Sequence, residues 1–124
     1  SWTVLRAATA AMCKSGTTTL EAAVAGTPLV VCYRTAPLTY AIAKRVVALR
    51  DIGLVNIVAG RRVAPEFIQH ALTPAHVAPV LLPLLDEASP ERAAMVAALA
   101  EVRATLGEPG AAARTARLAL ELLA

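Results

Sequence analysis

Residues 10–21 read AAMCKSGTTTLE, an apolar tetrapeptide followed by a polar turn and the start of a second apolar segment. The tetrapeptide predicts a short buried strand, and the turn predicts a helix that runs to Ala25. Ser15 is expected to cap that helix with its hydroxyl, and Gly26 to end it in a left-handed conformation. The run PLVVCY at residues 28–33 predicts a second strand, apolar on both faces as parallel strands are.

The rest of the chain extends this alternation of strands and helices. Residues 2–8 resemble the end of a helix, a helix is predicted after Pro37, and LVNIV at residues 54–58 predicts a third strand. Residues 60–65 form a predicted loop that leads into a short helix to His70. From Thr73 onward only helices are predicted, with Ser89 as a second N-cap. The fold class is therefore α/β, a partial doubly wound parallel sheet followed by a helical tail.

Composition agrees with such a fold and limits the function classes. Hydrophobic residues make up 57% of the 124 residues and aromatic ones only 3%, so Ala, Val and Leu form the core. No apolar run has the length of about 18 residues that a membrane span needs. No signal peptide is visible, and because the chain starts at Ser1 within a helical pattern, we expect a fragment or a processed piece. Cys13 and Cys32 are expected to be buried free thiols in the reducing cytosol, without metal-ligand spacing.

The net charge of +3 conceals a strongly basic middle segment. Residues 34–62 contain six basic side chains and one acidic side chain, a local balance of +5. Such a segment suits phosphate ligands or an anionic membrane surface, whereas a solvated helix face without a partner is the simpler alternative. Nucleic acid is not expected, because the segment has neither interleaved aromatic residues nor a binding signature.

The turn between the first predicted strand and helix has the properties of an anion site. Open parallel sheets place ligands at the carboxyl ends of their strands. Small residues let backbone N–H groups approach an anion there, and the helix dipole favours a phosphate. Glu21 shares a helix face with Thr17 and Thr18, where a carboxylate can accept hydrogen bonds from both hydroxyls of a ribose. The alternative is an ordinary helix start with a solvated glutamate.

A family resemblance adds to this interpretation. SGTTTLEA at residues 15–22 and PLVVCYR at residues 28–34 resemble the core motif of lipid-A-disaccharide synthases. PLTY at residues 37–40, AKR at 43–45 and VNIVAGR at 55–61 continue the resemblance, which then runs through Pro65, Glu66 and residues 81–85 to the end of the chain. The first motif is shared loosely with other glycosyltransferases built from two Rossmann domains, whereas the Tyr-Arg and Asn-Ile-Val-Ala-Gly-Arg motifs are more specific.

The resemblance implies a transferase of the two-Rossmann-domain (GT-B) type that joins two glucosamine lipids. The implied donor is UDP-2,3-diacylglucosamine, the acceptor is 2,3-diacylglucosamine 1-phosphate, and the products are a β-1,6-linked disaccharide and UDP. Residues 1–86 would form the nucleotide-sugar-binding part, and helices in residues 87–124 would pack back on it. The N-terminal acceptor domain is absent from this sequence, so the fragment is expected to be inactive alone. The enzyme would work in the cytoplasm, at the anionic inner-membrane surface, and its last helices can take part in exchange within a homodimer.

The family's motif also suggests residue roles. Ser15, Gly16 and Thr17 would hold the donor diphosphate and Glu21 its ribose, while Asn56, Gly60 and Arg61 would line the same cleft. Arg34 would offset phosphate charge, although a surface ion pair is an equal alternative, as backbone satisfaction is for Asn56. No catalytic residue is expected in this chain, His70 and His76 included, because the family's general base belongs to the other half. No metal or cofactor is expected.

Two other functions remain open from the sequence alone. The chain can be the donor domain of another UDP-sugar enzyme, such as a peptidoglycan glycosyltransferase or a UDP-N-acetylglucosamine epimerase. An epimerase needs acidic and histidine groups in its cleft, which this stretch lacks. Alternatively, the chain is a non-catalytic module whose basic middle and leucine-rich tail contact membranes or proteins.

Overall fold

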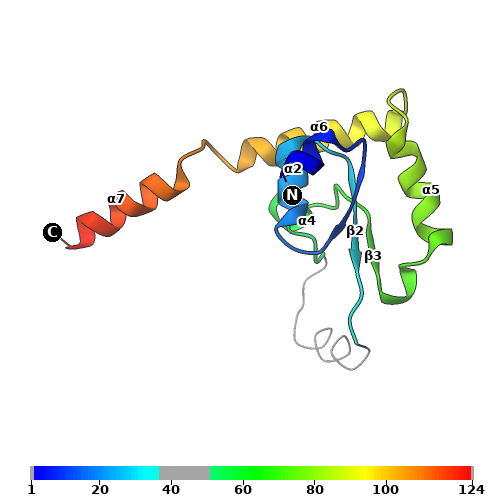
Figure 1. Cartoon of the computed structure of the whole chain (residues 1–124), viewed down its shortest axis with the longest axis horizontal. Helices are drawn as coiled ribbons and strands as arrows, with labels where there is room; N and C mark the ends of the chain where they lie inside the picture. The colour runs from blue at the N-terminus through cyan, green and yellow to red at the C-terminus, as the bar shows by residue number, and fades with distance from the viewer. Residues whose placement is uncertain (1, 37–50, 124) are drawn as a thin grey trace.

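A computed structural model describes residues 2–36 and 51–123, and its centre is a small parallel sheet (Figure 1). The strands are β1 (Ala11–Lys14), β2 (Leu29–Tyr33) and β3 (Glu66–Ile68), in the spatial order β1-β2-β3. Ala11 is aligned with Leu29, and Val31 with Glu66. Because all three strands are parallel, their carboxyl ends lie at one edge of the sheet.

Helices surround this sheet and extend beyond it. They are α1 (Trp2–Ala7), α2 (Thr18–Ala25), α4 (Leu54–Ala59), α5 (Pro74–Leu85), α6 (Pro90–Thr105) and α7 (Ala111–Leu123), with a 3-10 turn, η1 (Gln69–Ala71). The long helix α6 contacts α2, α4 and α5. It passes the amino end of β2, where the N–H of Leu29 donates to Sδ of Met95 at 3.3 Å. The predicted fold class, a partial doubly wound sheet followed by a helical tail, is confirmed.

Apolar side chains of the sheet and of helices α1, α2, α4, α5 and α6 form the core. Leu29, Val30 and Val31 of β2 are fully buried, as the run of apolar residues predicted. Ala22 and Ala23 of α2, Val55 of α4 and Leu99 of α6 pack in the same cluster. Each buried Val or Leu contributes about 1.5–3 kcal/mol relative to an exposed one. This core fixes the positions of the strands, and therefore of the turns that follow their carboxyl ends.

Two predicted elements are wrong. Residues 54–58 form helix α4 rather than a strand, and the third strand is Glu66–Ile68, where a short helix was predicted. The run of Val and Ile favours a strand in isolation, but as a helix it buries Val55 and Asn56, while Ile57 and Val58 remain exposed. The strand position beside β2 is taken by residues 66–68, a segment too short to show a periodic pattern.

The predicted helix ends are confirmed at two positions and wrong at one. Gly26 ends α2 with φ +75°, and the Ser89 hydroxyl accepts from the N–H of Arg92 at 3.3 Å. Ser15 does not cap α2, because Thr17 occupies the N-cap position without a side-chain bond. The hydroxyl of Ser15 is used elsewhere, as described below. The predicted helix after Pro37 lies outside the described residues.

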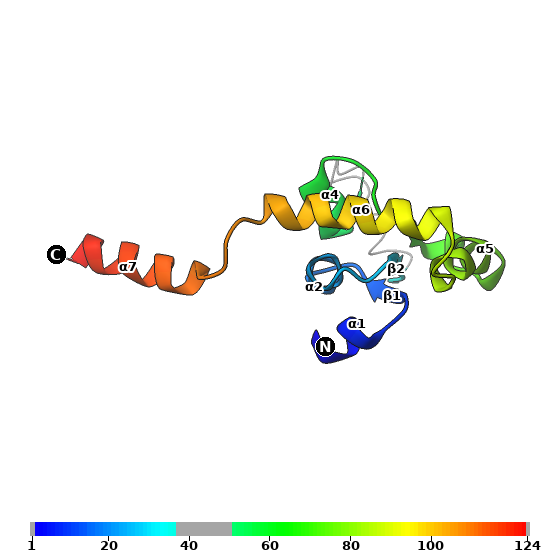
Figure 2. The same cartoon turned by 90° about the horizontal axis from the view of Figure 1, so that it is seen from above.

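The two last helices differ in how they relate to the core. Met95, Ala98, Leu99 and Val102 of α6 are buried, whereas Leu106, which follows the helix, is 40% exposed. Helix α7 contains no buried residue and points away from the rest of the molecule (Figure 2). The proposed division of the chain at residue 86 stays a prediction. Among the described residues, no helix combines the length and apolar character needed to cross a bilayer.

The two cysteines are free, as predicted, but only Cys13 is buried, whereas Cys32 is partly exposed. Cys13 is aligned with Val31 and is 3% exposed, whereas Cys32 is aligned with Lys14. Residues paired across a ladder point to the same face, and neighbours along a strand point to opposite faces. The two thiols therefore lie on opposite faces of the sheet, which explains why adjacent strands do not bring them into a disulfide.

Candidate functional site

The turn that follows β1 presents unpaired backbone N–H groups at the carboxyl edge of the sheet. Gly16 adopts φ +144°, a value that L-residues rarely adopt, and α2 begins two residues later. The carbonyls of Gly16 and Thr17 accept hydrogen bonds from the first turn of α2. Within the described part of the chain, the N–H groups of Gly16, Thr17 and Thr18 have no hydrogen-bond acceptor. Residues 15–18, called here the 15–18 turn, therefore offer several donors at a helix start.

Two hydroxyl groups fix this turn against the start of α4. The Ser15 hydroxyl donates to the carbonyl of Ile52 at 2.7 Å. Thr19 is fully buried, and its hydroxyl donates to the carbonyl of Gly16 at 2.8 Å and accepts from the N–H of Val55 at 3.2 Å. A hydroxyl has only one proton to donate. Because Ser15 donates it to the carbonyl of Ile52, it has none left to donate to a ligand.

Asn56 is 1% exposed and forms four hydrogen bonds within the protein. Its Oδ1 accepts from the N–H groups of Val63 and Ala64, both at 2.9 Å. Its Nδ2 donates to the carbonyl of Ala64 and to Oε1 of Glu66, both at 2.8 Å. An amide side chain has two donor protons and two acceptor lone pairs, so this arrangement uses all of them. Asn56 therefore matches the alternative left open by the sequence, in which it satisfies backbone groups.

Glu21 lies in the first turn of α2, partly exposed, one helical turn after the 15–18 turn. Its charge acts on Cys13 of β1. Burial is the main cause that raises the pKa of the Cys13 thiol, and the charges of Cys32 and Glu21 add to it. Glu21 thus lies close enough to β1 for its charge to act on the Cys13 thiol.

Arg34 follows β2 at the same edge and is tied to the segment after β3. Its guanidinium donates to the carbonyls of Leu72 at 2.7 Å and Gln69 at 3.4 Å. The side chain of Gln69 also pairs with the backbone of Thr35, accepting at 2.9 Å and donating at 3.0 Å. These bonds use some of the N–H donors of the Arg34 guanidinium. Their acceptors are backbone carbonyls, whereas the sequence suggested either a phosphate or an ion pair.

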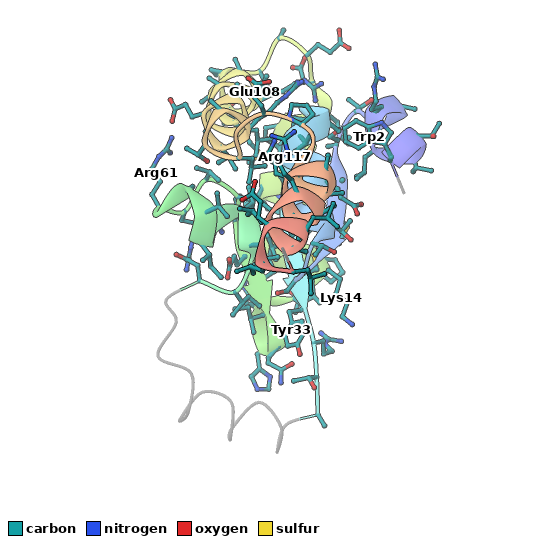
Figure 3. All side chains as sticks on the ribbon, turned by 90° about the vertical axis from the view of Figure 1, so that its left-hand side faces the viewer. Trp2, Lys14, Tyr33, Arg61, Glu108 and Arg117 are labelled. Atoms are coloured by element: carbon teal, nitrogen blue, oxygen red, sulfur yellow. The ribbon has the colours of Figure 1, made fainter. Side chains whose placement is uncertain are left out.

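Gly60 and Arg61 lie at the other end of α4. Gly60 ends the helix with φ +64°, and Arg61 pairs with Glu101 of α6 at 2.7 Å, both side chains being more than half exposed. In Figure 3, Arg61 lies apart from Lys14 and Tyr33, the residues that end β1 and β2. The structure therefore gathers Ser15, Gly16, Thr17 and Glu21 in and just after one turn. Asn56 is buried against residues 63–66, and Arg61 pairs with α6.

The basic middle segment is only partly described. Arg61 and Arg62 face the acidic side chains of Glu101 and Asp51, whereas Lys44, Arg45 and Arg50 lie outside the described residues. His70 and His76 are exposed, and His76 Nδ1 lies 3.1 Å from the Thr73 hydroxyl. Residues 2–36 and 51–123 contain no group of three side chains able to hold a metal ion.

Sequence reasoning missed two residues that hold the site together, Thr19 and Glu66. The carboxylate of Glu66 accepts hydrogen bonds from the backbone N–H groups of Ile52 and Gly53 and from Asn56. A glutamate directly after Pro65, at the start of a predicted short helix, gives no sign of this role. Thr19 offered a weak signal, since a threonine in the first turn of a helix commonly bonds to backbone groups nearby.

Comparisons with known proteins identify a family for the chain. The family described as Lipid-A-disaccharide synthetase matches residues 1–120. The chain is 45% identical over 123 residues to the lipid-A-disaccharide synthase of Syntrophus aciditrophicus, covering 99% of this chain and 32% of that protein. It is 46% identical to the synthase of Acidobacterium capsulatum and 44% identical to that of Syntrophotalea carbinolica, covering 96% of this chain and 30% of each relative.

The chain thus spans about a third of the length of these curated relatives. The match extends over β1, the 15–18 turn, α4 and α6 without leaving out a described element of the core. On these grounds the chain belongs to the lipid-A-disaccharide synthetase family.

Proposed function

We propose that the 15–18 turn binds the diphosphate of a UDP-sugar donor in a lipid-A-disaccharide synthase. The observation that carries this proposal is the set of unpaired N–H groups of Gly16, Thr17 and Thr18 at the start of α2. A diphosphate is the anion that such a set favours, because donors and helix dipole point to the same place. Membership of the family supports a UDP-sugar as this donor.

The neighbouring residues complete a nucleotide site in this proposal. Glu21, one helical turn after the 15–18 turn, accepts hydrogen bonds from the ribose hydroxyls. Arg34 retains N–H donors beyond those bonded to the 69–72 carbonyls and adds positive charge at the same sheet edge. Asn56 does not contact the donor in this proposal, but its hydrogen bonds hold the segment at residues 52–66 in place. Gly60 ends α4, and Arg61 links the end of that helix to α6.

The reaction proposed for the whole enzyme is a glycosyl transfer. The 6-hydroxyl of 2,3-diacylglucosamine 1-phosphate attacks the anomeric carbon of UDP-2,3-diacylglucosamine, the bond from that carbon to the diphosphate breaks, and UDP leaves. The acceptor hydroxyl loses its proton to a group that this chain does not supply. The contribution of residues 16–18 is to stabilise the negative charge that develops on the leaving diphosphate.

We propose further that the enzyme works on the cytoplasmic side of the inner membrane as a peripheral protein and that it can form a homodimer. The basic segment at residues 34–62 supports contact with anionic lipids. Reversing the charges of Lys44 and Arg45 should then reduce binding to vesicles that contain phosphatidylglycerol, with UDP binding unchanged. Unchanged vesicle binding would remove the membrane part of the proposal.

A titration of the 124-residue chain with UDP, followed by NMR, tests the donor site. UDP should shift the amide signals of Gly16, Thr17 and Thr18, and ADP should shift them much less. Glu21→Ala should weaken UDP binding while far-UV circular dichroism stays the same. Shifts that lie elsewhere in the folded chain, or no response to UDP, would contradict a donor site at this turn.

A further inference from the structure

We propose that Glu66 is a positioning residue for the 15–18 turn, acting through Ile52 and Ser15. In this proposal the backbone amides of residues 16–18 hold the diphosphate, and the Ser15 hydroxyl fixes the turn instead of contacting the ligand. The inference rests on the donor-binding role proposed above for this turn. It assigns a role to a side chain from β3 that the family resemblance did not include in the site.

The contacts form a continuous path from β3 to the turn. Glu66 Oε2 accepts from the N–H of Ile52 at 3.0 Å, and Oε1 accepts from the N–H of Gly53 at 2.8 Å. The carbonyl of the same Ile52 accepts the Ser15 hydroxyl at 2.7 Å. One residue, Ile52, is therefore held by Glu66 through its N–H and by Ser15 through its carbonyl. A shift of Ile52 would move the point to which Ser15 is anchored.

The carboxylate form of Glu66 is required by its partners, which are all donors. Ile52 and Gly53 offer backbone N–H groups, and Asn56 offers Nδ2 at 2.8 Å. A carboxylate accepts at both oxygens, whereas a glutamine at this position would direct its own N–H protons at one of these donors. Glu66→Gln thus changes the hydrogen bonding with little change in volume.

Close packing at Gly53 supports the same interpretation. A Cβ atom added at Gly53 would lie 3.0 Å from Cγ2 of Val31 and 3.1 Å from Oε1 of Glu66. The backbone of residue 53 therefore approaches Glu66 so closely that a side chain there must displace the carboxylate or the strand. Gly53→Ala provides a second way to disturb the Glu66 contact, without changing any charge.

The orientation of the Ser15 hydroxyl determines what the turn can offer a ligand. With its proton donated to Ile52, the oxygen presents only lone pairs, which repel a phosphate oxygen. The N–H groups of residues 16–18 do not have this limitation. Ser15→Ala should therefore disturb UDP binding by the same route as Glu66→Gln, through the position of the turn.

A double-mutant cycle on the 124-residue chain tests this coupling, with UDP affinity and amide chemical shifts measured by NMR. Glu66→Gln and Ser15→Ala should each weaken UDP binding about three- to ten-fold, the range of a coupling carried by neighbouring contacts. The double variant should bind about as weakly as either single variant. Both single variants should also shift the amides of Gly16 and Thr17 before UDP is added. Glu87→Gln, which removes an exposed carboxylate between α5 and α6, is the matched control and should change neither quantity.

Additive losses in the cycle, or unchanged UDP affinity and unchanged amide shifts in Glu66→Gln, would overturn the positioning role. A wild-type chain that fails to bind UDP would count against the donor site, while the amide shifts without UDP would still decide whether Glu66 positions the turn. If Glu66→Gln does not fold, Gly53→Ala takes its place in the same cycle and should shift the same two amides.

Discussion

The side-chain amide of Asn56 forms a pair of hydrogen bonds with the backbone of Ala64. Its Oδ1 accepts from the N–H of Ala64 at 2.9 Å, and its Nδ2 donates to the Ala64 carbonyl at 2.8 Å. The same side chain also contacts Glu66. The buried amide of Asn56 thus satisfies backbone groups of Val63 and Ala64, in the segment that leads directly into β3. This arrangement makes Asn56 sensitive to changes that preserve its shape.

Asn56→Asp should strongly destabilise the fold at neutral pH, by about 3 kcal/mol. The substitution replaces the Nδ2 donor with an acceptor, and it brings a second carboxylate next to Glu66. Since like charges raise carboxyl pKa values, mild acid should protonate one of the pair and recover part of the loss. Urea unfolding at neutral and mildly acidic pH measures both effects. A variant equally stable at the two pH values would contradict the contact with Glu66.

Gly16→Ala should destabilise the chain by about 1–2 kcal/mol, because φ +144° lies outside the regions that L-residues occupy. Space is not the cause, since nothing lies within 4 Å of the added Cβ. Gly60→Ala is the matched control, because Gly60 is equally open but has φ +64°, within the left-handed helical region. Thermal unfolding should show the larger loss for Gly16→Ala, and the reverse order would argue against this turn geometry.

Cys32 should react with iodoacetamide faster than Cys13 in the folded chain. Burial raises the pKa of both thiols, so both should react more slowly than a free cysteine. Cys32 is partly exposed in an apolar groove of about 480 Å³ that includes Met12 and Leu72, whereas Cys13 is 3% exposed. Mass spectrometry of Cys13→Ser and Cys32→Ser variants separates the two rates. Labelling of Cys13 should require urea, and equal rates in the native state would show that β1 opens readily.

The chain should lose stability in acid in part because the stabilising contribution of the Glu91 carboxylate is lost. The Ser89 hydroxyl donates to Glu91 Oε2 at 2.8 Å, and this bond lowers the pKa of the Glu91 carboxyl. A group whose pKa is lower when folded contributes stability above its unfolded pKa and loses that contribution as the pH falls through the folded value. Urea unfolding at neutral pH and near pH 3 should therefore show a smaller difference for Glu91→Gln than for the wild type.

Ser89→Ala removes both the partner of Glu91 and the cap of α6. It should cost about 1 kcal/mol at neutral pH through the loss of the bond to Arg92 N–H. In this variant the pH dependence should also be reduced, because the pKa of Glu91 returns towards its ordinary value. An unaltered pH dependence would indicate that another carboxylate carries the effect.

The sequence was informative where local chemistry determines the structure. The apolar run of β2, the left-handed end at Gly26 and the serine cap of α6 were all predictable, because each depends on residues within one turn or strand. Residues 54–59 were mispredicted because their β-branched side chains favour a strand, while the helix is stabilised by packing and by contacts with β3. The three residues of β3 were missed because so short a segment shows no periodic pattern and is recognisable as a strand only by its alignment with β2.

The candidate site was predictable only in its outline. A small, polar turn between an apolar strand and a helix indicated an anion site at residues 15–18. The partners of Ser15 and Asn56 were not predictable, because Ile52 is 37 residues away from Ser15 and Glu66 is 10 residues away from Asn56. Contacts of this kind depend on how β3 and α4 are brought together, which no local pattern records.

Helix α7 has a consequence for how folding of this chain is observed. Its 13 residues contain no buried side chain, and an isolated helix of that length is marginal in water. Its amide protons should therefore exchange with deuterium within seconds to minutes, while those of β2 and α6 require opening of the core. A melting curve recorded at 222 nm should accordingly show a gradual early loss of ellipticity from α7, followed by one sharp cooperative step from the rest.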